Sequence, residues 1–91
     1  MAFTDAEIEE AHEAVRTAGS SDDLYKLGLI YSTGQGGDVD LIQAHMWFNL
    51  AASRGSRAAR DARKELSDYM SASEIAQAQK LAREWLSTAR H

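Results

Sequence analysis

The sequence predicts an all-α fold of stacked antiparallel helix hairpins, and three observations lead to it. The chain of 91 residues contains no proline, so its segments can run as uninterrupted helices. Apolar residues recur at steps of three and four, which is the spacing of one face of an α-helix. Clusters of glycine, serine and aspartate separate five such segments. Because the links are short, neighbouring helices should lie antiparallel and form a short α/α solenoid.

The first predicted helix covers residues 5–18. Thr4 followed by Glu7 has the form of a capping box, in which each side chain bonds the backbone N–H of the other residue. Gly19 should end this helix. The apolar stripe of the helix consists of Phe3, Ile8, Ala11, Val15 and Ala18.

The second and third helices should form a hairpin around the glycine-rich loop 34–37. We expect Ser21 or Asp22 to cap the second helix, and Asp38 or Asp40 to cap the third. The third helix should end at Gly55, and its broad apolar face predicts that it is the most buried of the five. The apolar positions are Leu24, Leu27, Gly28 and Tyr31 in the second helix, and Leu41, Ala44, Trp47, Phe48, Ala51 and Ala52 in the third.

Two further helices follow in the last third of the chain. Ser56 can open the fourth helix, whose inner side should carry Ala59, Ala62, Leu66 and Tyr69. A second capping box, Ser71 to Glu74, predicts the start of the fifth helix. The apolar positions of the fifth helix are Ile75, Ala78, Leu81, Ala82, Trp85 and Leu86.

Composition and charge exclude several classes of function. The chain has no cysteine, which removes disulfides, thiolate metal sites and cysteine nucleophiles. It has no apolar run of the roughly 18 residues that span a membrane, and its acidic start lacks the basic segment of a signal peptide. We therefore expect a cytoplasmic protein that does not enter membranes. The net charge of −4 argues against nucleic-acid binding, although it combines −6 over residues 1–23 and −1 over residues 24–53 with +3 over residues 54–91.

No group of residues in the sequence predicts catalysis or a cofactor. Glu9 and His12 have the Glu-x-x-His spacing of di-iron bundles, but such a site needs a second copy, and the sequence has none. His45 and His91 are isolated, and we expect His45 to be partly buried or on the surface. The loop 34–37 lacks the strand and lysine of a phosphate-binding loop. The prediction is a protein without catalytic, metal or cofactor sites.

The central part of the chain is similar to a known helical repeat. The matching positions are Leu27, Gly28, Tyr31, Gly34, Gly36, Asp40, Ala44, Trp47, Ala51, Ala52, Gly55 and Ala59. This order resembles the Sel1-like repeat family, a helix-hairpin module related to tetratricopeptide repeats. The resemblance implies that small residues sit where two helices cross closely and that aromatic residues fill the space between the helices.

The resemblance also implies how the chain is organised. Residues 20–59 correspond to a Sel1-like repeat, residues 5–19 to a degenerate N-terminal half-repeat, and residues 60–91 to C-terminal capping helices, all within a single domain, 1–91. Where a following repeat would have Leu-Gly, this chain has Arg63 and Lys64. Residues 60–91 therefore depart from the repeat pattern.

The function that this resemblance implies is a bacterial-type adaptor that binds a partner protein or peptide and catalyses nothing. The candidate binding residues are an aromatic and polar group, Tyr25, Met46 and Asn49, and a basic row on the fourth helix, Arg57, Arg60 and Lys64. The alternative is a small regulatory or inhibitory protein whose acidic first helix blocks a basic surface of a target. Opposite charges at the two ends also leave self-association open.

Overall fold

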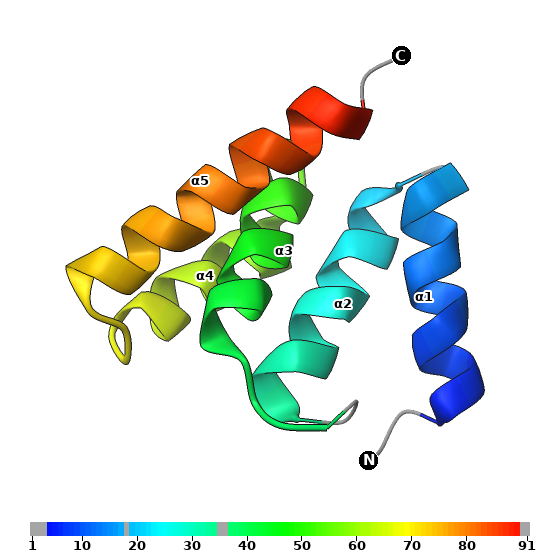
Figure 1. Cartoon of the computed structure of the whole chain (residues 1–91), viewed down its shortest axis with the longest axis horizontal. Coiled ribbons are helices and arrows are strands. Elements are labelled where there is room, and N and C mark those ends of the chain that lie inside the picture. The colour runs from blue at the N-terminus through cyan, green and yellow to red at the C-terminus, as the bar shows by residue number, and fades with distance from the viewer. Residues whose placement is uncertain (1–3, 18, 35–36, 90–91) are drawn as a thin grey trace.

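The computed structural model describes residues 4–17, 19–34 and 37–89, and these residues contain five α-helices and no strand. The helices are α1 (Asp5–Thr17), α2 (Ser21–Thr33), α3 (Leu41–Ser53), α4 (Arg57–Ser67) and α5 (Ala72–Ala89) (Figure 1). The prediction of an all-α solenoid is confirmed. Of the positions named above, Phe3, Ala18, Gly36 and His91 lie outside the described residues.

Local side-chain contacts explain where each helix begins. Both predicted capping boxes form: the Thr4 N–H donates to Glu7 Oε1 at 3.0 Å, and the Ser71 N–H donates to Glu74 Oε1 at 2.8 Å. Asp40 and Ser56 cap α3 and α4 as expected. The N-cap of α2 is Ser20 instead of Ser21 or Asp22, because the Ser20 hydroxyl accepts from the Asp23 N–H and Ser21 is already helical.

Two glycines end helices in a backbone conformation that favours glycine. Gly19 has φ of 64° and donates its N–H to the Ala14 carbonyl, which terminates α1. Gly34 has φ of 73°, and its N–H bonds the Ile30 carbonyl at the end of α2. The chain then turns back, and the Asp40 N–H donates to the Tyr31 carbonyl at 3.0 Å. This bond ties the start of α3 to the end of α2 and closes the hairpin.

The hairpin of α2 and α3 packs closely at a glycine. A Cβ placed on Gly28 would overlap the ring of Phe48, including a separation of only 2.9 Å from Cζ. Ala44 and Ala51 of α3 are fully buried. The expectation that a small residue lies where the two helices pack closely therefore holds at Gly28.

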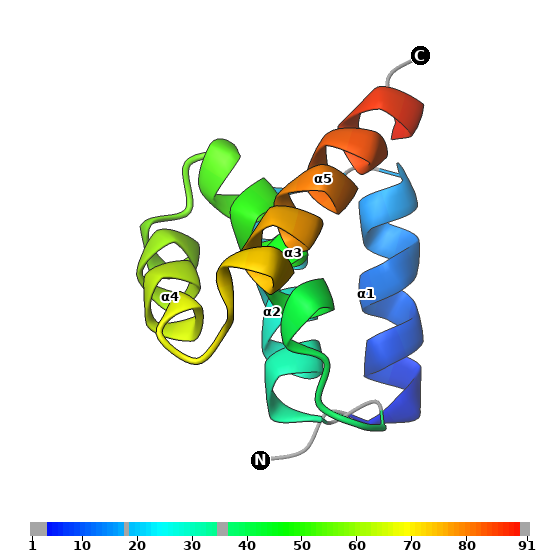
Figure 2. The ribbon, with the colours of Figure 1, turned by 60° about the vertical axis from the view of Figure 1, so that its left-hand side comes forward.

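Helix α3 is the centre of the molecule. It packs against α2, α4 and α5, whereas α1 packs mainly on α2. Figure 2 shows α4 and α1 on opposite sides of the α2–α3 hairpin, with α5 crossing α3. Trp47 on α3 contacts both α1 and α5. Its ring makes edge contacts with His12 of α1 and with Trp85 of α5, at centroid distances of 6.4 and 5.9 Å. The prediction that α3 is the most buried helix is correct.

The expected inward position of Tyr69 is wrong. Helix α4 ends at Ser67, and Tyr69 lies in the turn that follows, so helical spacing from Leu66 no longer determines its direction. Its side chain is 80% exposed. Tyr69 therefore lies at the surface, where it lines the groove described in the next section.

Candidate partner-binding groove

An open groove runs between α2 and α4, and we refer to it as the α2/α4 groove. Its volume is about 260 Å³. Six of its eight lining residues are aromatic or aliphatic, and the other two are a serine and a glutamate. The lining residues are Tyr25, Leu29, Ser32, Phe48, Ala62, Glu65, Leu66 and Tyr69.

The two tyrosines of the groove are held differently. Tyr25 is half-buried, and its ring packs against Phe48 with centroids 5.6 Å apart, so the hairpin core fixes its position. Tyr69 is largely exposed and sits at the end of α4. A tyrosine offers a large contact area and a hydroxyl while losing little conformational entropy, which is why it is enriched where proteins bind partners.

The predicted binding residues do not gather in one place. Tyr25 lines the α2/α4 groove. Met46 is only 6% exposed and belongs to the core. Asn49 is half-buried, and its Oδ1 accepts a hydrogen bond from Arg63 Nη1. Met46 and Asn49 therefore do not join Tyr25 among the residues that line the groove.

The basic row on α4 is exposed but does not line the groove. Arg57, Arg60 and Lys64 are all exposed, as the sequence predicts, and none of them is among the lining residues. Two other bases of this region have structural partners: Arg54 donates to the Gly19 carbonyl at 2.8 Å, and Arg63 bonds Asn49. Arg54 and Arg63 therefore bond other parts of the fold, while the basic row consists of Arg57, Arg60 and Lys64.

A buried polar network joins α3 to α4, and the sequence analysis did not anticipate it. His45 is 2% exposed, and its Nε2 lies 3.1 Å from the Ser67 hydroxyl, which in turn donates to the Arg63 carbonyl. Because that hydroxyl already donates its proton, it accepts from Nε2–H of His45. One signal could have revealed the network: Ser67 follows the buried Ala59 by eight residues, two steps of four, and therefore lies on the same side of α4.

The environment of His45 holds it in the neutral form. Burial lowers the pKa of His45, and the Arg63 guanidinium lowers it further, while the carbonyl of His45 itself acts in the opposite direction. His45 and Ser67 do not line the α2/α4 groove or either of the two other hollows described below. Their contact joins α3 to α4.

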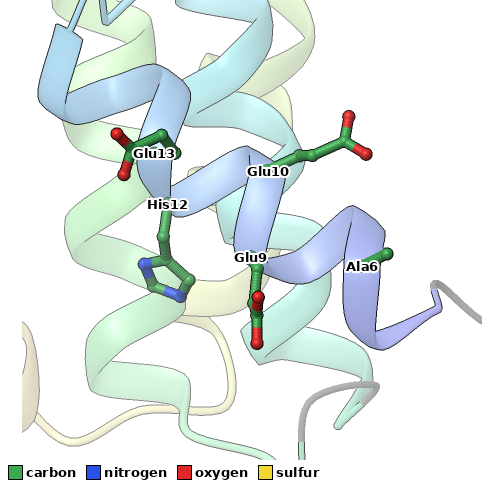
Figure 3. A pocket seen from close by; sticks show the side chains of 5 residues that line it. All are labelled: Ala6, Glu9, Glu10, His12 and Glu13. Carbon is green, nitrogen blue, oxygen red and sulfur yellow. The ribbon is translucent and has the colours of Figure 1, made fainter.

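A second hollow, of about 590 Å³, lies along the exposed face of α1. Its described lining residues are Ala6, Glu9, Glu10, His12 and Glu13. Figure 3 shows Glu9 and His12 extending from α1 in the same direction, whereas Glu10 and Glu13 project in other directions. His12 Nε2 is 3.3 Å from the Tyr31 hydroxyl, so this histidine helps to attach α1 to α2.

A third hollow, of about 540 Å³, lies beside the start of α3. It includes Tyr31, Asp40 and Glu74. Burial raises the pKa of Tyr31, and the Asp40 carboxylate adds to this effect. Asp40 and Glu74 are already engaged as helix caps. Within residues 4–17, 19–34 and 37–89, no three histidine, aspartate or glutamate side chains are grouped in a way that could hold a metal ion.

Comparison with known proteins identifies the central hairpin. The family model described as the Sel1 repeat matches residues 21–56, which span α2, the loop and α3. Sel1 repeats generally mediate protein–protein interaction. No curated protein and no solved structure matches the chain. None of the described helices has both the length and the apolar character needed to cross a membrane. Residues 21–56, which form the α2–α3 hairpin of this short α/α solenoid, therefore match a Sel1 repeat.

Proposed function

We propose that this protein is a non-catalytic adaptor that holds a segment of a partner protein in the α2/α4 groove. The observation that carries the proposal is Tyr69, whose side chain is 80% exposed at the edge of an apolar groove. Exposed apolar surface next to a concavity is typical of binding sites. The Sel1 repeat supports the same kind of function, because repeats of this family bind proteins.

The size of the groove fits one or two side chains of a partner segment rather than the surface of a folded protein. Its volume of about 260 Å³ has room for one or two side chains. Tyr25 and Phe48 form a fixed wall, while Tyr69 projects from the turn after α4. An extended or helical segment could place one apolar side chain between these rings, with its backbone lying along the groove.

The test compares proteins captured from a native lysate by the wild-type chain and by Tyr69→Ala. Because Tyr69 is exposed, the substitution should leave the fold intact, which far-UV circular dichroism checks. Leu86→Ala is the matched control, since Leu86 is also an exposed apolar residue, 38% exposed, but lies outside the groove. A partner that is lost with Tyr69→Ala and retained with Leu86→Ala supports the proposal. Equal capture by all three chains contradicts it.

The acidic face of α1 supports a second candidate function, a regulatory protein that blocks a basic surface. Glu9, Glu10 and Glu13 are exposed and line the hollow on α1. Replacing these three glutamates with glutamine removes the charge and keeps the length of each side chain. Loss of partner binding in this triple variant, with binding retained in Tyr69→Ala, would favour the regulatory function over the adaptor.

A further inference from the structure

The exposed surface of α4 carries two charged rows of opposite sign. Asp61, Glu65 and Asp68 follow one another at steps of four and three, so they form one row along the helix. Arg57, Arg60 and Lys64 follow one another at steps of three and four and form the other row. All six side chains are exposed. We call the first set the acidic row and the second the basic row.

Only the acidic row reaches the α2/α4 groove. Glu65 lines the groove together with Ala62 and Tyr69, and no residue of the basic row does so. Asp61 and Asp68 stand one turn before and one turn after Glu65 on the exposed surface of α4, and neither lines the groove.

One carboxylate of α2 lies on the same side of the helix as the groove without lining it. Asp22 is exposed and lies three residues before Tyr25, on the side of α2 that Tyr25 and Leu29 share. Lys26 is the one base of α2, and it is exposed without lining the groove. Among the described residues that line the groove, Glu65 is therefore the one charged side chain, and its charge is negative.

Building on the proposed adaptor function, we propose that the segment held in the α2/α4 groove is a basic amphipathic peptide. An apolar or aromatic side chain of the peptide occupies the space between Tyr25 and Tyr69, and neighbouring lysine or arginine side chains approach Glu65 and Asp61. The tyrosine rings also attract cations through their faces. Charge complementarity of this kind increases the association rate and discriminates against acidic segments.

The experiment is a selection from a displayed random peptide library on the immobilised protein. The enriched peptides should combine lysine or arginine with an aromatic or branched aliphatic residue. One enriched peptide is then synthesised with a fluorophore, and its affinity is measured by anisotropy. Raising the salt from about 50 mM to about 300 mM should weaken binding, because the contacts between charges are exposed to solvent.

Two double variants of α4 form a matched pair. In Asp61→Asn/Glu65→Gln the acidic row loses two charges, and we expect binding to weaken about fivefold to tenfold. In Arg60→Gln/Lys64→Gln the basic row loses two charges on the same helix, and binding should stay within about twofold of wild type or become tighter. Circular dichroism checks that both variants remain helical.

The outcomes separate this inference from the proposed function. Enriched peptides that are acidic or uncharged, but lose binding in Tyr69→Ala, would leave the adaptor function in place and overturn the basic partner. Basic peptides that bind the acidic-row variant as well as wild type would also overturn it, since they must bind elsewhere. If no enriched peptide binds more weakly to Tyr69→Ala than to wild type, the proposed adaptor function itself is contradicted. Analytical ultracentrifugation could instead detect a salt-sensitive dimer in which a second copy of the chain fills the groove. That result would overturn the inference, because the occupant would then be a second copy and not a peptide.

Discussion

Replacing Gly28 with alanine sets two physical effects of opposite sign against each other. In an exposed helix this change stabilises the helix by about 1 kcal/mol, because alanine has the higher helix propensity. At Gly28 the added methyl group would overlap the Phe48 ring, and Phe48 is 2% exposed and packed against Tyr25. The ring can therefore yield only by displacing Tyr25 or by shifting toward the α2/α4 groove that it lines.

The packing effect should win. Overfilling a close-packed core costs about 1–3 kcal/mol, and subtracting the propensity gain leaves a net loss of up to about 2 kcal/mol in the free energy of unfolding. For a chain of this size each kcal/mol lost lowers Tm by about 4–8 °C. Urea denaturation followed by circular dichroism measures the free energy, and a thermal scan measures Tm.

The Phe48→Leu background provides the control. Leucine is smaller than phenylalanine and leaves room for a methyl group at position 28, so Gly28→Ala should there be neutral or stabilising. The double-mutant cycle should give a coupling free energy of about 2 kcal/mol between the two positions. A stabilising Gly28→Ala in the wild-type background, or equal effects in both backgrounds, would refute the close packing of α2 on α3.

Three further predictions concern other parts of the fold. Burial lowers the pKa of His45, so below about pH 6.5 the unfolded chain gains a proton that the folded chain resists. The free energy of unfolding should therefore fall between about pH 7.5 and pH 5, and it should fall less in His45→Gln; equal pH dependence in both proteins would contradict a buried neutral histidine. Ser71→Ala removes the N-cap of α5 and should cost about 1 kcal/mol by urea denaturation. Ser73→Ala, at an exposed position in the same turn, is its control, and equal losses would argue against the cap. Tyr69→Ala should change the free energy of unfolding by less than about 0.5 kcal/mol, and a larger loss would mean that Tyr69 supports the fold rather than a partner.

The helices could be predicted from the sequence because the information that defines them is local. A capping box needs only four residues, and both boxes were identified from serine or threonine followed by glutamate. The N-cap of α2 could not be chosen correctly, because Ser20, Ser21 and Asp22 are all good caps. Which one is used depends on where the backbone leaves the Gly19 turn, and that is a property of the packed hairpin.

The groove could be predicted only in part, because its contacts are not local. Tyr25 was identified as a binding residue, since it stands beside the apolar stripe of α2 without being part of it. Tyr69 was assigned to the core because spacing from Leu66 assumes that the helix continues, and α4 ends before it. The pairing of His45 with Ser67, 22 residues apart, required knowledge of how α3 crosses α4.

Unequal numbers of neighbours should give the five helices unequal local stabilities. Helix α1 has one main neighbour, α2, whereas α3 is covered by three helices. In a linear stack each unit is stabilised by the units beside it, so α1 can detach and refold while the rest stays intact. Amide hydrogens of α1 should therefore exchange with solvent well before those of α3, which exchange only on global unfolding. A truncated chain that begins at Ser20 should still fold, with the Trp47 side chain newly open to water where His12 had covered it.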